Sequence, residues 1–181
     1  MAEKRLILAS GSPRRSELLS KMGYTFETCA QDVDEHISGV PSEIVRTLAV
    51  RKAHAAAEHT SGVVIASDTL VSLDSKPLGK PADAEDAKRM LRALSNREHE
   101  VFTGVCVLET ETGREEVRVE RTGVHFRPIA ETEIEEYVQT GEPMDKAGAY
   151  AIQGGAGVFV DALDGSFSNV MGFPTKAVRE M

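Results

Sequence analysis

The chain has no long hydrophobic run and few cysteines. Only four apolar residues separate Arg5 from Ser10, too few for the core of a signal peptide, and no later run approaches the length of a membrane span. The two cysteines, Cys29 and Cys106, lie in different segments without a CxxC spacing. Such cysteines are typical of free thiols in a reducing cytosol, so we expect a cytoplasmic protein without a membrane partner.

An excess of positive charge and several common site motifs are also absent. Lysine and arginine total 21 against 29 acidic residues, and the net charge of −8 argues against binding to DNA or RNA. The sequence contains no GxxxxGK[ST] loop, no GxGxxG after the first predicted strand and no GxSxG elbow. The spacing of His54 and His59 does not suit a zinc site. A small anionic ligand stays compatible with this composition, because a few basic side chains can converge inside one cleft.

The patterns that are present indicate an α/β protein with one domain over residues 1–181. A parallel-type strand–turn–helix opens the chain, and an antiparallel hairpin around Thr112-Gly113 favours a mixed, twisted sheet with flanking helices. Helices are predicted at 13–22, 41–58, 83–94 and 131–139, with a short one after Pro174. Strands are predicted at 5–9, 25–30, 62–66, 70–73, 100–108 and 117–126, with a constrained loop at 77–81 and an irregular, glycine-rich segment at 143–157.

The first helix begins with two arginines. Ser12 suits its N-cap and Pro13 its first position, so Arg14 and Arg15 fall in the first turn, where free N–H groups and the helix dipole already carry positive charge. Together with the small-residue loop from Ser10 to Ser12, they describe a phosphate cradle. The alternative is a capped helix whose arginines point into solvent.

Two acidic positions are candidates for chemistry. Asp68 follows the apolar run 62–66, and a carboxylate directly after such a strand is expected at the carboxyl edge of the sheet, where α/β folds place ligands. The alternative is a turn aspartate without a ligand. Glu35, in the acidic segment 32–35, offers a second carboxylate, and hard oxygen ligands of this kind suit Mg²⁺ or Mn²⁺.

Two lysines are candidates for binding an anion. Lys52 lies in the middle of the apolar arc of the helix at 41–58, so it either extends past the apolar surface to water or faces a cleft. Lys80 lies between Gly79 and Pro81, which restrict the backbone around it. It would neutralise phosphate charge there, or simply be exposed.

Taken together and in this order, four segments resemble the Maf family over residues 6–174. They are Leu8–Arg15 (LASGSPRR), Ala66–Thr69 (ASDT), Gly79–Pro81 (GKP) and Glu142–Tyr150 (EPMDKAGAY). The resemblance implies a fold like that of inosine triphosphate pyrophosphatase, with two lobes around a cleft, often in a homodimer. It also implies hydrolysis of nucleoside triphosphates to the monophosphate and pyrophosphate with a divalent metal ion. The segment 145–154 is similar to that of the branch acting on dTTP and UTP.

The resemblance also implies roles for individual residues. Asp68 matches the proton acceptor, while Arg14, Thr69 and Gln153 match positions linked to substrate choice. The phosphate-binding set comprises Ser10, Ser12, Arg14, Arg15, Lys52 and Lys80, and the metal is expected at Glu35 and Asp68. Gln153 offers both a donor and an acceptor, which suits the carbonyl–imide edge of uracil or thymine.

Two other functions remain open from the sequence. A small-residue loop followed by arginine at the first strand–helix turn also occurs in nucleotidyltransferases, although such enzymes are usually longer because they need room for a second substrate. The other alternative, which the resemblance to the Maf family implies, is a nucleotide-binding regulator of septum formation without turnover. Incubation of UTP with metal and no acceptor separates hydrolysis from both.

Overall fold

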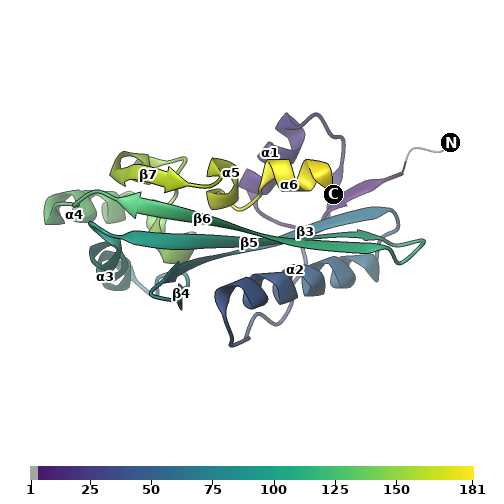
Figure 1. Cartoon of the computed structure of the whole chain (residues 1–181), viewed down its shortest axis with the longest axis horizontal. Coiled ribbons are helices and arrows are strands. Elements are labelled where there is room, and N and C mark those ends of the chain that lie inside the picture. Colours follow the sequence, from purple (N-terminus) through teal and green to yellow (C-terminus); the bar gives the residue numbers. More distant parts are fainter. Residues whose placement is uncertain (1–3) are drawn as a thin grey trace.

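The computed structural model describes residues 4–181, and within them seven strands form one mixed sheet (Figure 1). The strand order is β2-β1-β3-β5-β6-β7, with β4 paired to the open edge of β3. Only β1 makes parallel pairs, with β2 and β3, and the remaining pairs among the described strands are antiparallel. The strands are β1 (Leu6–Leu8), β2 (Glu27–Thr28), β3 (Val63–Leu73), β4 (Lys76–Leu78), β5 (Glu98–Glu109), β6 (Glu115–Phe126) and β7 (Val160–Asp164).

Helices cover both faces of this sheet. They are α1 (Pro13–Lys21), α2 (Pro41–Ala57), α3 (Ala84–Leu94), α4 (Glu131–Gln139), α5 (Phe167–Val170) and α6 (Thr175–Glu180), with 3₁₀ turns η1 (Glu142–Asp145), η2 (Ala147–Ala149) and η3 (Gly155–Phe159). In Figure 1, α2 lies along one face, and α1 and α6 lie on the opposite side. The predicted α/β class, with a mixed sheet and flanking helices, is confirmed. No helix among residues 4–181 combines the length and apolar character needed to span a membrane.

Successive side chains of β3 point to opposite faces of the sheet, so at one end of the sheet they pack in two separate apolar clusters. Val64 and Ala66 point to α2 and pack with its alanines, while Ile65 points the other way and packs with Leu19 of α1 and Val178 of α6. At the other end of the sheet, Val71 packs in a separate cluster that includes α3 and α4. Along β3, Asp68 lies between Ala66 of one cluster and Val71 of another.

The predicted break between strands at 62–66 and 70–73 is wrong, because β3 runs unbroken through Asp68. Its antiparallel ladder with β5 continues from Val63 opposite Glu109 to Ser72 opposite Glu100, so the polar residues in its middle keep their backbone partners. On its other edge, β1 ends opposite Ile65 and β4 begins pairing at Val71. The gap between β1 and β4 therefore leaves residues 66–70 open on that edge. Asp68 lies there in mid-strand with its side chain only 11% exposed, and not at the carboxyl end of a strand.

A glycine lets α2 approach this part of the sheet. Gly104 of β5 lies opposite Asp68, and a Cβ on it would be 2.3 Å from the backbone oxygen of Val45 in α2. Such a contact is too short for any side chain, so the close packing of α2 on β5 requires glycine at this position. This packing carries Lys52 of α2 to the level of Asp68.

Most other elements agree with the sequence, with three differences. The four long helices lie within two residues of their predicted ranges, and the β5–β6 hairpin is confirmed. The predicted loop at 77–81 instead begins as β4, which a turn with positive φ at Asp74 (52°) and Ser75 (63°) folds back onto β3. The strand predicted at 25–30 is reduced to β2, and the irregular segment 143–157 forms the 3₁₀ turns.

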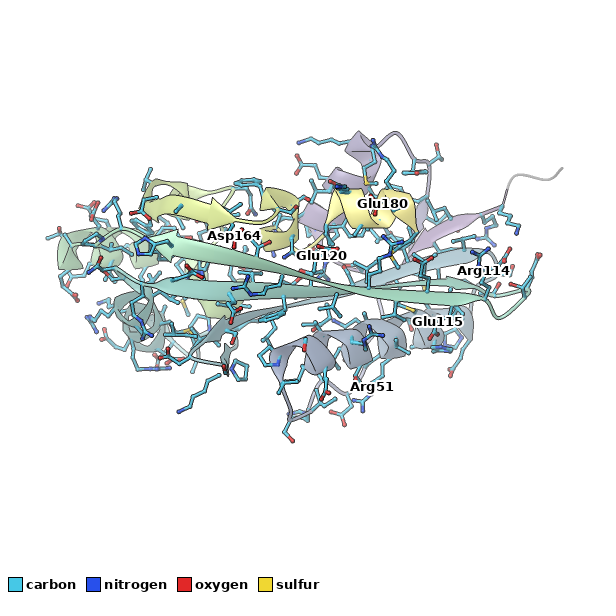
Figure 2. All side chains as sticks on the ribbon, viewed as in Figure 1. Arg51, Arg114, Glu115, Glu120, Asp164 and Glu180 are labelled. Atoms are coloured by element: carbon cyan, nitrogen blue, oxygen red, sulfur yellow. The ribbon has the colours of Figure 1, made fainter. Side chains whose placement is uncertain are left out.

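Charged side chains also tie the helices to β6 at the surface. Figure 2 labels Glu115 near the start of β6, where it pairs with His54 of α2, and Glu180 of α6, which pairs with Arg118 of β6. These pairs are partly exposed, so each contributes at most about 1 kcal/mol to stability.

Candidate active site

A cleft of about 790 Å³ opens between the two ends of the sheet. Its walls come from the turn before α1 and the start of that helix, from α2, from the middle of β3, from the segment 142–154 and from the turn after α5. Segments that are far apart in the sequence therefore share one concave surface, which is the usual form of a small-molecule site.

All of the predicted site residues except Ser10 line this cleft. Those that line it are Ser12, Arg14, Arg15, Glu35, Lys52, Asp68, Thr69, Lys80 and Gln153. Ser10 lies beneath the turn and is only 7% exposed. Its hydroxyl oxygen accepts hydrogen bonds from the Ser12 amide at 3.1 Å and from the Arg15 guanidinium at 3.5 Å. Ser10 therefore holds the turn in shape from below and does not face the cleft.

The start of α1 directs positive charge into the cleft, as the sequence predicts. Ser12 takes the N-cap position, but its side chain makes no capping hydrogen bond, so it does not occupy the first-turn N–H groups. Arg15 is half-buried and donates from Nε to the Gly172 carbonyl at 2.9 Å. Burial lowers the pKa of Arg15 to about 10, with the charge of Asp68 working against this effect, so the guanidinium stays positive at neutral pH.

A buried polar chain fixes Arg15 from behind. Its NH2 group donates to the Thr69 hydroxyl at 3.2 Å, Thr69 and Thr103 share a hydrogen bond of 2.9 Å, and the Thr103 hydroxyl donates to the Asn169 carbonyl at 3.1 Å. Since Thr103 has one proton and gives it to that carbonyl, Thr69 must donate to Thr103 and accept from Arg15. Sequence reasoning missed Thr103 of β5 and Asn169 of α5, because nothing local distinguishes them from other polar residues in strands and helices.

Lys52 lies between two carboxylates. Its ammonium group is 2.8 Å from Oδ1 of Asp68 and 3.0 Å from Oε1 of Glu35. The side chains of Lys52 and Asp68 are only 13% and 11% exposed, whereas that of Glu35 is 60% exposed. Of the two alternatives left open by the sequence, the structure selects the one in which Lys52 faces a cleft.

Burial raises the pKa of Asp68 above its ordinary value. The nearby ammonium of Lys52 opposes this effect by favouring the charged form. A carboxylate of raised basicity, held at one oxygen by a lysine and open to a cleft, is suited to accept a proton from a bound molecule.

The donor set fits a hard divalent cation only in partnership with a ligand. Among residues 4–181, no three His, Cys, Asp or Glu side chains form a complete metal site. However, Asp68 and Glu35 both reach the same ammonium group, so their carboxylates lie close together. Mg²⁺ commonly uses one or two protein carboxylates and takes its other ligands from water and substrate phosphates. The pair therefore suits such an ion.

The wall of the cleft formed by Lys80 and the segment 142–154 carries further polar groups. Lys80 is held near η2, because the Gly79 carbonyl accepts from the Gly148 amide at 3.1 Å. Lys146 lines the cleft with its side chain only 16% exposed and pairs with Asp145. Sequence reasoning did not assign Lys146 a role, although it lies in the quoted segment 142–150. Because the Asp145–Lys146 pair and Gln153 share this wall, it carries both charged and neutral recognition groups.

The chain is similar to known proteins over nearly its whole length. The family model described as Maf-like protein matches residues 5–181. The dTTP/UTP pyrophosphatase of Desulforamulus reducens is 48% identical over 178 residues, covering 97% of this chain and 93% of the relative. The dTTP/UTP pyrophosphatase of Anaeromyxobacter dehalogenans is 51% identical over 173 residues, covering 94% of this chain and 88% of the relative. A solved dITP/XTP pyrophosphatase from Mycobacterium abscessus matches at 19% identity and a TM-score of 0.46, covering 69% of this chain and 75% of that one.

Proposed function

Because this chain belongs to the Maf family, we propose that it hydrolyses dTTP and UTP to the nucleoside monophosphate and pyrophosphate. The observation that carries this proposal is the convergence of Arg14, Arg15, Lys52 and Lys80 on one cleft with the buried carboxylate of Asp68. A nucleoside triphosphate carries about four negative charges, so catalysis must chiefly position and neutralise them. The cleft supplies cations from α1, from α2 and from the loop after β4, which suits a triphosphate chain lying between them.

Asp68 is the proposed general base. Lys52 holds Oδ1, which leaves Oδ2 to take a proton from a water molecule beside the triphosphate. The raised pKa of Asp68 makes it a stronger acceptor than an exposed carboxylate, while the charge of Lys52 favours the ionised form that accepts a proton. In this role Lys52 orients the base.

Glu35 and Asp68 are the residues proposed to hold a divalent metal ion, Mg²⁺ or Mn²⁺. When bound, that ion would neutralise phosphate charge and stabilise the departing pyrophosphate. Arg15 contributes fixed positive charge on the same side, because Gly172 and Thr69 hold its guanidinium in place. The first turn of α1 adds N–H groups for phosphate oxygens.

Gln153 is proposed to read the base. Its side-chain amide offers a donor and an acceptor together, which matches the carbonyl–imide edge of uracil or thymine. Arg14 and Thr69, which line the same cleft, are the other positions proposed for substrate choice.

The proposal includes a cytoplasmic homodimer. The two cysteines are unpaired and Cys106 is buried, which is compatible with a reducing compartment. The dimer rests on the family resemblance alone. Size-exclusion chromatography with light scattering at micromolar concentration tests it, and a monomer at all concentrations would contradict it.

The test of activity is a panel of triphosphates with Mg²⁺ or Mn²⁺ and no acceptor. We expect UTP and dTTP to yield monophosphate and pyrophosphate in equal amounts, and faster than CTP or 7-methyl-GTP. Turnover only after a sugar phosphate is added would indicate a nucleotidyltransferase. Binding of UTP without metal-dependent turnover would indicate a regulatory protein.

A further inference from the structure

The segment 151–155, with Gln153 at its centre, is anchored on both flanks. On one side, the Ala151 amide donates to Oη of Tyr137 in α4 at 3.0 Å. On the other, the Gly155 amide donates to the Glu142 carboxylate, at 3.1 Å to Oε2 and 3.4 Å to Oε1. The two anchored amides are each two residues from Gln153, so both ends of this short segment are attached to the α4–η1 region.

Tyr137 is a rigid anchor. It is 5% exposed, and its ring meets that of Phe159 edge-on, with centroids 5.5 Å apart and an interplanar angle of 90°. Burial raises the pKa of the Tyr137 phenol, so it stays protonated and its oxygen remains a neutral acceptor for the Ala151 amide. Unlike Glu142, Tyr137 is not among the residues that line the cleft.

Two adjacent glycines make this anchoring possible. A Cβ on Gly154 would be 1.9 Å from Oε1 of Glu142, and a Cβ on Gly155 would be 3.0 Å from the Tyr137 ring. Any side chain at Gly154 would therefore have to displace the carboxylate or the segment. Because Gly154 and Gly155 have no side chains, the backbone can contact Glu142 and Tyr137 directly.

The charge of Glu142 indicates which part of a substrate lies beside it. A carboxylate next to the triphosphate repels it unless a cation offsets its charge, as Lys52 does for Asp68 and Glu35, and the cations proposed for the phosphates come from α1, α2 and Lys80. Glu142 lines the cleft and lies instead against Gly154, the chain neighbour of Gln153, which is the residue proposed to read the base.

We propose that Glu142 and Tyr137 are positioning residues that set nucleobase selectivity by holding the segment 151–155. The inference rests on the proposed pyrimidine triphosphate hydrolysis and concerns the same cleft. A hydrogen-bonding side chain discriminates between bases only if its backbone is held still, because a mobile amide pairs with several edges. Gln153 is the residue proposed to form hydrogen bonds with the base, and Glu142 and Tyr137 fix the position of its backbone.

The experiment compares UTP with CTP in wild type and in the variants Glu142→Ala, Glu142→Gln and Tyr137→Phe. Loss of one charge-assisted hydrogen bond predicts that Glu142→Ala raises KM for UTP about tenfold and lowers the UTP/CTP ratio of kcat/KM about tenfold. Glu142→Gln keeps one acceptor oxygen for the Gly155 amide, so its ratio should lie nearer to wild type. Tyr137→Phe keeps the ring packing and should lower the ratio severalfold.

A readout without a base separates positioning from general damage. Inorganic tripolyphosphate carries the phosphates alone, and its inhibition constant against UTP should stay within about twofold in all three variants. Glu136, an exposed residue of α4, supplies the matched control, and Glu136→Ala should leave both selectivity and inhibition unchanged. Thermal melts establish that each variant is folded.

A double variant tests the geometry directly. Gly154→Ala should lower UTP/CTP selectivity as much as Glu142→Ala does, because its methyl group takes the place of the carboxylate. In the double variant with Glu142→Ala, Gly154→Ala should cause little further loss of selectivity, since Oε1 of Glu142, with which the added methyl group would clash, is absent.

The results that overturn the inference differ from those that overturn the proposed function. If wild type prefers UTP and the Glu142 and Tyr137 variants keep that preference, the positioning role is wrong and the function stands. If tripolyphosphate inhibition weakens as much as UTP turnover, the residues are structural only. If Glu142→Ala loses selectivity but Tyr137→Phe does not, the carboxylate touches the base itself and the anchoring role is wrong. If wild type does not hydrolyse UTP, the proposed function fails first.

Discussion

Replacing Asp68 with asparagine tests the chemistry most directly. The substitution keeps the size of the side chain and removes its basicity, while Lys52 retains Glu35 as a partner at 3.0 Å. We therefore expect a folded protein with strongly reduced turnover. Because the pKa of Asp68 is raised, the folded state holds this proton more tightly than the unfolded chain. As the pH rises from the pKa of Asp68 in the unfolded chain through its higher pKa in the folded protein, ionisation of Asp68 destabilises the native state. At pH 7, Asp68→Asn should therefore resist urea at least as well as wild type.

The size of the loss follows from the surroundings of Asp68. Loss of a general base costs about 10²–10⁴ in rate, which corresponds to roughly 3–5 kcal/mol of transition-state stabilisation. Glu35 contacts the same ammonium and is 60% exposed, so it can take a proton from water less effectively. Because Glu35 can partly replace Asp68 as the proton acceptor, we expect kcat to fall by about 10²–10³.

The assay is pyrophosphate release from UTP at saturating Mg²⁺, followed from pH 4 to 9. In wild type, the acid limb of kcat/KM should lie above the usual pKa of an aspartate, and Asp68→Asn should lose that limb. Asp164→Asn, on the exposed edge strand β7, is the matched control and should keep wild-type turnover (Figure 2). An Asp68→Asn enzyme with more than a tenth of wild-type kcat would show that another group takes the proton.

Two further predictions concern stability. Gly104→Ala should lower the free energy of unfolding by about 3 kcal/mol or more in urea titrations, because its Cβ would be 2.3 Å from the backbone oxygen of Val45. Gly79→Ala, whose Cβ would meet nothing within 4 Å, should cost less than about 1 kcal/mol, and equal losses would contradict the packing argument. His99 is buried against Tyr150, and burial lowers its pKa to about 4, so the unfolded chain binds this proton more tightly and stability falls as the pH drops below about 6.5. Between pH 7 and pH 4.5, wild type should lose about 2–3 kcal/mol more than His99→Gln in urea titrations, and identical pH dependence of the two would refute this.

The sequence identifies those elements whose signals are local. Ser12 and Pro13 at the start of α1 and Gly23 beyond its end bound that helix, because capping depends on residues within one turn. The apolar spacing of Ala87, Met90, Leu91 and Leu94 predicts the buried face of α3, and all four are buried. The break predicted at residues 67–69 fails because pairing with β5 outweighs the local polarity.

The candidate site divides in the same way. Most of its residues are found from motifs, since a motif records residue types that are needed together, whatever their distance apart. The motifs do not distinguish Ser10, which lies under the turn, from Ser12, which faces the cleft. Nor do they reveal Thr103 or Tyr137, whose contacts with Thr69 and Ala151 join residues 34 and 14 positions apart.

By itself, then, the sequence determined the class of fold, most helix boundaries and the set of charged groups available for an anionic ligand. Local capping and periodicity depend on neighbours along the chain, and composition needs no structure at all. Only the tertiary structure decided that Lys52 faces inward, that Asp68 lies in the gap between β1 and β4, and that Gln153 is held from both sides. Each of these depends on close packing between distant segments, which is determined by all of the contacting residues together.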